Sequence, residues 1–485
     1  MRLLIIHLLL TFALNSLLTA QNTDTHTGNA LPKGFDSGDS TRKIVVERII
    51  IAGAKKTREH IIRREIHFNE GDTIALGVLN REVQLARQQV YNTNLFNEVK
   101  FEVTASGQNK ITVLVLLRER WYVFPVPVLQ LVDRNINEWI KLYDADLSRL
   151  IYGIKFNHFN LTGRRDQLRI VALNGFTRQL SFSYINPYID KKLTRGMVLG
   201  GGLVYNKTFI YKTDTFNRAL FFNNNEFSRT SYFANAGFTL RKDIRNVHSF
   251  SISFNHIAVT DSLLKEPYNP NYFISSGNQV NLLDLTYGYQ YMNVNNVAYP
   301  LKGTTASLLL NRRGLGFSGG MDMTTAEIGY NRYVDIKNNV FFSFQFNGKI
   351  SLPFDQPYLN RRAMGYGDYY LRGLELQVID GVASAMTRLT LKKKIWSVRL
   401  PFPFGKEKGN GIPLSLFAKT YADAGYVHTL EQYRSQLNNK LLYAGGLGID
   451  LLTLYDLSLR LEYSFNQLGQ NGLFLHLGFG LQSTR

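Results

Sequence analysis

Apolar and polar residues alternate along most of the chain after Trp121, in short segments separated by Asn, Asp, Gly and Pro. In Leu457–Phe465 every odd position is apolar and every even position is polar. Alternation with a period of two is typical of β-strands that have one apolar and one polar face. A water-soluble β-sandwich would show the same local pattern, so alternation alone leaves both architectures open.

The chemistry of the two faces favours a membrane barrel. One face is rich in large apolar and aromatic residues, and the other carries small or charged residues, as the interior of a barrel allows. An even number of strands closes such a barrel without leaving an edge in lipid. The predicted fold is therefore an all-β transmembrane barrel of sixteen antiparallel strands over residues 150–485. The strands are expected at 150–160, 166–175, 178–187, 196–210, 215–226, 229–241, 247–260, 279–293, 300–311, 316–332, 340–351, 384–397, 413–427, 441–452, 456–466 and 472–481.

Residues 43–119 have a different pattern, which predicts one small α+β domain. A β-branched run ends at Gly53, and a later segment repeats apolar residues every three or four positions, as a helix does. One sheet packed on two helices can bury a core at this size. Residues 120–149 are predicted to connect this domain to the barrel. The expected elements are a strand at 44–51, helices at 58–66 and 75–91, and strands at 97–103 and 110–117.

The first twenty residues predict a secretory signal peptide. A positive start at Met1-Arg2 precedes the apolar run Leu3–Leu14, and small residues lead to Ala20, where cleavage is expected. A membrane-anchoring helix is the alternative, but the apolar run is short for crossing a bilayer. Residues 21–42 are polar and are expected to form a disordered tether.

Composition fits export to a membrane. The 485 residues include no cysteine, which excludes disulfides and thiolate metal sites. Aromatic residues make up 13% of the chain, yet the mean hydropathy is only −0.15, as alternation in barrel strands predicts. The formal charge of +19 would suggest nucleic acid in a cytoplasmic protein. For an exported chain, anionic lipid headgroups or a basic lumen are the expected counterparts, and no nucleic acid is expected.

We find no catalytic motif. The nine histidines are scattered without metal-ligand spacing, and there is no G-x-S-x-G sequence and no phosphate-binding glycine-rich loop. The expectation is a protein that is not an enzyme and needs no cofactor or metal.

Several motifs carry a family resemblance. Ile49-x-Ile51-x-Gly53 resembles the end of the first strand of a POTRA domain, and Tyr91–Val99 resembles the junction between its second helix and second strand. At that junction Leu95 and Phe96 would fill the core as the chain turns from helix to sheet. The rest of the chain is similar to the barrel of the BamA/TamA outer-membrane assembly and secretion family.

Three barrel segments support the resemblance. Asn186-Pro187-Tyr188 resembles the motif that closes the family's third strand, and Tyr299–Gly303 resembles the turn before its ninth strand. Tyr370-Leu371-Arg372-Gly373-Leu374 resembles the VRGF/Y motif, which lies in a long loop between strands eleven and twelve of the family. The independent strand assignment places residues 352–383 in that same gap.

The resemblance implies that Arg372 folds into the lumen and pairs with Asp423. A planar guanidinium can hold a carboxylate through two parallel hydrogen bonds, which suits a secluded site. A solvated loop charge is the alternative for Arg372. The family's second acid, a Glu in the strand after the loop, is replaced here by Thr390. Glu375 or another lumen acid is the candidate substitute.

The resemblance also implies a C-terminal signal and a seam between the first and last strands. Phe479 would be the signal aromatic, displaced inward by Gly480–Arg485. The seam would join Tyr152–Phe159 to Leu473–Phe479, so its residues would include Tyr152, Phe159, Leu475 and Leu477.

The function implied by the resemblance is noncovalent insertion of barrel proteins into the outer membrane, or passage of polypeptide across it. The expected partners are outer-membrane lipid, unfolded client polypeptides, and periplasmic chaperones or lipoproteins. The POTRA domain would lie in the periplasm, and its being single favours an accessory or specialised member. An outer-membrane pore for small solutes or ions is the main alternative, and an adhesive surface protein is a weaker one.

Overall fold

The structure is a computed structural model in which part of the chain is described. The predicted signal peptide, the tether before Thr41, the stretch 132–149 of the predicted connector and Phe479 lie outside the described residues. No helix in the described part is long and apolar enough to cross a membrane. The described residues are 41–131, 150–224, 226–273, 277–315, 321–401 and 411–478.

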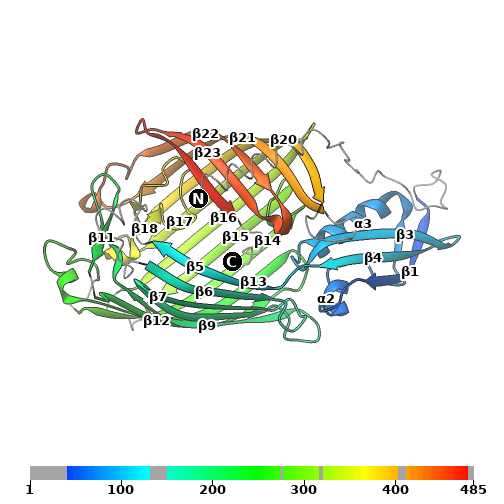
Figure 1. The fold of residues 1–485 in the computed structure, drawn as a ribbon, viewed down its shortest axis with the longest axis horizontal. Helices are drawn as coiled ribbons and strands as arrows, with labels where there is room; N and C mark the ends of the chain where they lie inside the picture. The colour runs from blue at the N-terminus through cyan, green and yellow to red at the C-terminus, as the bar shows by residue number, and fades with distance from the viewer. Residues whose placement is uncertain are drawn as a thin grey trace.

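The N-terminal domain is a four-stranded sheet that packs against two helices (Figure 1). Its strand order is β2-β1-β4-β3, in which β1 and β4 are parallel. The predicted order of elements is found, with one short additional strand, β2. The elements are β1 (Lys43–Ala52), α2 (Glu59–Arg63), β2 (Thr73–Ala75), α3 (Leu76–Tyr91), β3 (Phe96–Gly107) and β4 (Lys110–Glu119).

The domain core contains the residues expected at its junctions. Leu95 and Phe96 are buried where α3 passes into β3. Gly53 has a φ of 92°, and a Cβ atom there would lie 1.9 Å from the carbonyl oxygen of Leu117. Only glycine fits this close approach of the end of β1 to the neighbouring strand.

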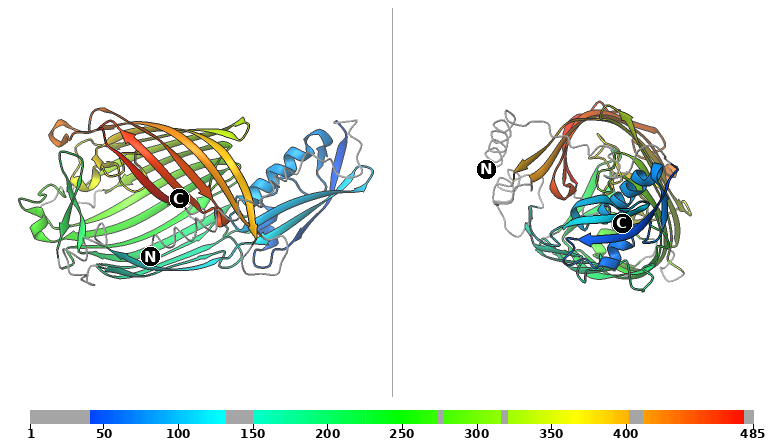
Figure 2. Two further views of the ribbon diagram at one scale, coloured as in Figure 1. Left: turned by 45° about the horizontal axis from the view of Figure 1, so that its top comes forward. Right: turned by 90° about the vertical axis from the view of Figure 1, so that its right-hand side faces the viewer.

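The rest of the described chain is dominated by one sixteen-stranded antiparallel sheet rolled into a barrel (Figures 1 and 2). This confirms the predicted fold class. Its strands are β5 (Val123–Leu131), β6 (Leu150–Phe159), β7 (Gln167–Gly175), β8 (Thr177–Asn186), β9 (Arg195–Asn206), β12 (Arg229–Leu240), β13 (Asn246–Val259), β14 (Gln279–Val294), β15 (Gly303–Arg313), β16 (Met323–Lys337), β17 (Val340–Leu352), β20 (Ala383–Pro401), β21 (Gly411–His428), β22 (Leu441–Leu452), β23 (Ser458–Asn466) and β24 (Asn471–Gly478).

Large apolar side chains occupy the outer surface of this sheet. On β24, for example, Leu473, Leu475 and Leu477 are all exposed, as are Tyr463 and Phe465 on β23. A continuous apolar outer surface is what lipid requires and what water would oppose. The alternation in the sequence therefore corresponds to a lipid-facing outside and an enclosed interior.

The strand count is right, but two assignments behind it are wrong. Residues 120–149 were expected to be a connector, yet Val123–Leu131 is the first barrel strand and pairs along its length with β6. The expected barrel strand 215–226 contains β11 (Ala219–Asn223), which pairs with β10 (Thr208–Thr213) in a separate hairpin. Pro125 and Pro127 obscure the pattern of β5, and proline is tolerated there because β5 is an edge strand.

The predicted position of the seam is also wrong. Tyr152 and Phe159 lie on β6, which is paired on both sides, with β5 and with β7. The ends of the sheet are β5 and β24, and no pairing joins them within the described residues. For the same reason, Asn186-Pro187-Tyr188 follows the fourth barrel strand rather than the third.

The end of the barrel far from the N-terminal domain is covered by a packed cap. The β10–β11 hairpin and the short helices η2 (Asp261–Leu264) and η3 (Tyr358–Asn360) contribute to one apolar cluster. Asn217, in the hairpin turn, donates to Ser435 Oγ at 2.7 Å and accepts from Val378 N at 2.8 Å, which ties the surface loops together. The buried members of the cluster are Phe209, Phe222, Val259, Leu263, Tyr272, Phe273, Val280, Leu282, Met321, Tyr358 and Leu359.

Candidate functional site: the lumen loop and the domain junction

The loop between β17 and β20 folds against the inner wall of the barrel. It contains two short paired strands, β18 (Arg362–Met364) and β19 (Ile379–Asp380). Leu371 and Leu374 of this loop are buried in one cluster with Val427 and Leu442 near the far ends of β21 and β22. The loop is therefore a packed part of the barrel.

Arg372 and Asp423, the pair implied by the resemblance, are brought together. Arg372 Nε donates to Asp423 Oδ2 at 2.9 Å, and Nη2 donates to the other carboxylate oxygen. The backbone N–H of Arg372 also donates to Oδ2, at 3.0 Å. The ring of Tyr421 lies under the guanidinium at 4.0 Å. Both charged residues are buried, so this is a fork-on-carboxylate contact rather than a solvated charge.

Thr390 occupies the place of the family's second acid and contacts the same arginine. Its hydroxyl accepts a hydrogen bond from Arg372 Nη1 at 3.0 Å, and the carbonyl of Leu389 accepts one from Nη2 at 3.3 Å. Asp423 therefore supplies the negative charge, and two neutral oxygens accept from two of the three remaining N–H groups. Glu375, the candidate substitute, contacts His476 instead.

The other motif residues connect this pair to neighbouring strands. The carbonyl of Tyr370 accepts from Arg388, whose Nε is 3.9 Å from Asp423 Oδ2. The carbonyl of Gly373 accepts from Asn466 at 2.7 Å. Gly373 has a φ of 89°, and a Cβ there would lie 3.0 Å from the Cβ of Ser464. The motif thus spans the inner wall from β20 to β23.

A second charge network on the same wall was not predicted. Lys419 on β21 donates to Asp450 on β22, and to Glu462 on β23 at 2.5 Å. Tyr299 donates to Asp450 at 2.7 Å, and Lys392 lies 3.4 Å from the same carboxylate. Lys392, Lys419, Asp450 and Glu462 are at inward positions of their strands, so correct strand registers would have identified them, whereas Tyr299 lies in the turn between β14 and β15.

Glu375, Glu462 and His476 are the described residues that come nearest to a metal site. Their ligand atoms lie within 4.8 Å of one another. Glu462 already accepts a hydrogen bond from Lys419, and His476 lies 3.2 Å from Glu375. The ammonium of Lys419 competes with a cation for Glu462, so the cluster fits an ion-pair network better than a metal centre.

A second buried arginine pair joins the N-terminal domain to the barrel. Tyr188, in the turn between β8 and β9, is fully buried in the domain core and donates to Glu65 Oε1 at 2.9 Å. Arg241, directly after β12, donates to both oxygens of Glu65, at 2.6 and 3.0 Å. Burial alone would raise the pKa of Glu65, but the guanidinium of Arg241 outweighs it and lowers that pKa to about 2.

The junction has a second polar contact, made by Arg120 after β4 and by Tyr91 at the end of α3. Arg120 donates to Asp456, in the turn between β22 and β23, at 2.7 Å, and Tyr91 donates to the same carboxylate at 3.1 Å. Burial, together with the Asp456 charge, raises the pKa of Tyr91 to about 12. Asn296, after β14, also donates to Asp456, at 3.0 Å. The domain is thus held from several barrel turns at once.

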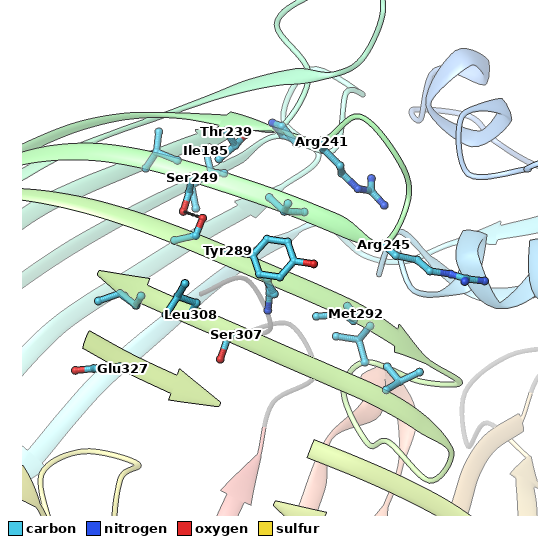
Figure 3. Close-up of a pocket in the computed structure, with 18 of the residues that line it drawn as sticks. Ile185, Thr239, Arg241, Arg245, Ser249, Tyr289, Met292, Ser307, Leu308 and Glu327 are labelled. Atoms are coloured by element: carbon cyan, nitrogen blue, oxygen red, sulfur yellow. Dashed lines mark hydrogen bonds between the residues drawn. The ribbon is translucent and has the colours of Figure 1, made fainter. Parts of the chain in front are cut away.

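A cavity of about 980 Å³ lies in the lumen between α3 and the loop. Gln88 and Asn92 of α3 line one side, and Tyr366 and Tyr369 of the loop line another. Figure 3 shows Ser249, Ser307 and Glu327 along its barrel wall, with Arg241 and Arg245 at the edge beside the N-terminal domain. The cavity is therefore lined by several polar side chains, and the loop and helix bound it.

Protein-family models match both the N-terminal domain and the barrel. Residues 44–120 match the POTRA family model, described as a surface antigen variable number repeat. Residues 160–471, more than half of the chain, match the Omp85 superfamily domain.

Solved structures with a similar arrangement include BamA from Haemophilus ducreyi lacking POTRA domains 1–3. It is 17% identical over 90% of this chain and 84% of that one, with a TM-score of 0.47. CdiB from Escherichia coli is 10% identical over 96% and 93%, with a TM-score of 0.49. CdiB from Acinetobacter baumannii is 12% identical over 90% and 73%, with a TM-score of 0.45. The identities and TM-scores are low, so the assignment rests on the family models: this chain belongs to the Omp85 superfamily and carries a POTRA domain before its barrel.

Proposed function

We propose that this protein inserts unfolded barrel polypeptides into the outer membrane, or passes polypeptide across it, by noncovalent strand pairing. The POTRA domain lies in the periplasm in this proposal, and the capped end of the barrel faces the exterior. Membership of the Omp85 superfamily supports the proposal at the level of the family. The argument for this chain comes from its seam.

The observation that carries the proposal is the composition of β5 at the end of the sheet. Pro125 and Pro127 are two residues apart, so their backbone nitrogens point to the same side of the strand. Proline cannot donate, and within sheets its nitrogen points away from the paired neighbour. Since β5 is paired with β6, both nitrogens point toward β24, and the seam lacks two donors. A weak seam is where a client strand could enter.

The obstructed lumen argues against a pore for small solutes. The loop between β17 and β20 is fixed to the wall by Arg372, and the far end is covered by the apolar cap. A polypeptide leaving along the barrel axis would have to unpack both. Exit sideways through the seam disturbs neither, which favours insertion over passage through the lumen.

The POTRA domain offers a site for first contact with the client. Strand β3 is at the end of the domain sheet, and within the described residues its outer edge pairs with no other strand. An extended client segment can add to such an edge through backbone hydrogen bonds, with little dependence on sequence. The described residues hold one POTRA domain, so we propose a specialised member with few docking edges for chaperones or lipoproteins.

Proteoliposomes containing the full-length protein test the proposal. A small outer-membrane barrel protein, kept unfolded in urea, is diluted onto them, and its folding is followed by heat-modifiable migration. Faster folding than on empty liposomes of the same lipid is the expected result. In planar bilayers the protein should give small, unsteady currents. Equal folding rates together with large, steady conductance steps would favour the solute pore.

A further inference from the structure

The hairpin of β20 and β21 is longer than the strands on either side of it. Strand β17 pairs with β20 only as far as Lys393, and β22 pairs with β21 only from Ser415. Beyond Lys393, residues 394–401 of β20 continue to pair with residues 411–417 of β21, of which 411–414 have no partner on β22. In Figures 1 and 2, β20 ends at the end of the barrel that faces the POTRA domain.

This extension keeps the two faces of the barrel wall. A register shift between Lys394 and Trp396 marks where the extension begins. The serine pair Ser397–Ser415, whose hydroxyls are 2.9 Å apart, continues the inward face. By the alternation of β-strands, the outward face consists of the cross-strand pairs Trp396–Leu416, Val398–Leu414 and Leu400–Ile412. All six outward residues are apolar, so this face continues the lipid-facing surface.

The two edges of the extension differ. On the β21 edge, Pro413 pairs with Arg399, and its nitrogen points away from β20, so this edge lacks a donor. The β20 edge has no proline from Lys394 to Leu400. Its last contact with the neighbouring hairpin is the bond from Lys394 N to Asn339 O, at 2.9 Å. Proline at an exposed edge usually hinders pairing with a further strand, and here only the β21 edge carries one. We call this edge blunted.

Among the described residues no strand pairs with the β20 edge beyond Lys393. An apolar face and an unpaired backbone edge make opposite demands on their surroundings. The apolar face requires lipid, whereas backbone groups without partners are costly in lipid. A bound lipid cannot replace a row of alternating donors and acceptors. A strand with apolar residues outward and polar residues inward satisfies both demands.

We propose that the β20 edge from Ile395 to Leu400 is a binding site for one strand of a client barrel protein, in antiparallel pairing. This deepens the proposed function and rests on it. From Lys393 to Leu400 the hairpin carries three basic residues, Lys393, Lys394 and Arg399, and no acidic one, so the site favours client strands with acidic residues. Its place beside the POTRA domain puts it on the route between first contact and the membrane.

Disulfide scanning tests the site, because the chain has no native cysteine. Val398→Cys and Leu400→Cys are made singly, with Leu414→Cys, the cross-strand partner of Val398 on the same outward face of the β21 edge, as the matched control. The client is an unfolded outer-membrane barrel protein with one cysteine moved along its last strand. We expect cross-links at both β20 positions. Moving the cysteine two residues along β20 should move the cross-linked position on the client strand by two residues in the opposite direction, as antiparallel pairing requires. We expect none at Leu414→Cys.

Client folding is measured on the same samples, which separates the two proposals. Normal folding without cross-links at Val398→Cys and Leu400→Cys overturns the site and leaves the proposed function standing. Cross-links that form equally well with every client position also overturn the site. So does a cross-linking yield at Leu414→Cys equal to that at the β20 positions. Absent cross-links with folding that depends on anionic lipid would identify the hairpin as a headgroup site instead. Failure of wild-type protein to accelerate folding rejects the proposed function itself.

Discussion

Two buried arginine–carboxylate pairs in this molecule have nearly the same chemistry and different consequences. Arg241 joins Glu65 across the boundary between barrel and POTRA domain, and Arg372 joins Asp423 within the barrel. Each guanidinium donates to both carboxylate oxygens, and each has an aromatic residue beside it, Tyr188 or Tyr421. The first fixes how a domain sits, and the second fixes where a loop lies.

The comparison shows that a buried ion pair indicates where a domain or loop is held more than how much it stabilises the folded protein. Removing one partner of a buried pair leaves an uncompensated charge and costs about 3–5 kcal/mol, whereas the intact pair contributes much less. That cost falls on whichever equilibrium the pair controls. In one case this is docking of the POTRA domain, and in the other it is release of the loop.

The largest expected effect is that of Arg372→Ala. Asp423 would remain buried without its main partner, so we expect a loss of about 3–5 kcal/mol in the free energy that keeps the loop docked. Limited proteolysis within residues 353–382 and the temperature of heat-modifiable migration measure it. Arg241→Ala is the matched control, and it should expose the junction to protease rather than the loop. Wild-type behaviour of Arg372→Ala in both assays would show that Arg372 does not hold the loop.

The junction pair should respond to acid. The pKa of Glu65 is about 2 in the folded protein against an ordinary 4.5. Because the pKa of Glu65 is lower in the folded protein, its ionised carboxylate stabilises the docked domain fully above about pH 4.5. This stabilisation, about 3 kcal/mol in total, is lost as the pH falls from about 4.5 to about 2. Protease sensitivity of the POTRA domain should rise across that window. In Glu65→Gln this component of the acid response should be absent, and an identical pH profile in both proteins would rule it out.

Thr390→Val should have an intermediate effect. The substitution removes the hydroxyl that accepts from Arg372 Nη1 and leaves a charged donor unsatisfied, at a cost of about 1–3 kcal/mol. Thr390→Ser keeps the acceptor and should behave like the wild type. Loop proteolysis of the two variants decides the matter, and a loss in Thr390→Ser with wild-type behaviour of Thr390→Val would point to packing of the methyl group instead.

The smallest expected effect is that of Tyr188→Phe. It removes one donor to Glu65 while both bonds from Arg241 remain, so we expect a cost of about 1 kcal/mol at the junction. Tyr421→Phe is the matched change in the loop pair, and it keeps the ring beneath Arg372. Thermal unfolding of the two variants compares them. A larger loss for Tyr188→Phe than for Glu65→Gln would contradict this ordering.

The sequence predicts the loop pair better than the junction pair, for a physical reason. Tyr370–Leu374 and Asp423 stand in motifs with local signatures, and strand counting alone separates the loop from the wall. Glu65 and Arg241 are 176 residues apart and have no local signature, since their meeting depends on how two domains dock. Only the structure brings them together.

The strand assignment failed where local pattern and position in the sheet disagree. Pro125 and Pro127 interrupt the alternation of β5, which is tolerable only because β5 is an end strand, a property of the closed barrel. Ala219–Asn223 has good local strand character, but it pairs in the surface hairpin. Neither outcome is encoded in a short window of sequence.

A reversible lock on the seam tests the central claim most directly. Cysteine pairs are placed with one residue on β5 between Val126 and Gln130 and one on β24 between Leu473 and Leu477. Leu461→Cys with Leu475→Cys, which are register partners on β23 and β24, is the control. The account predicts that oxidation of a seam pair stops client folding on proteoliposomes, that reductant restores it, and that the control pair has no effect. Undiminished client folding with the seam cross-linked would contradict the account.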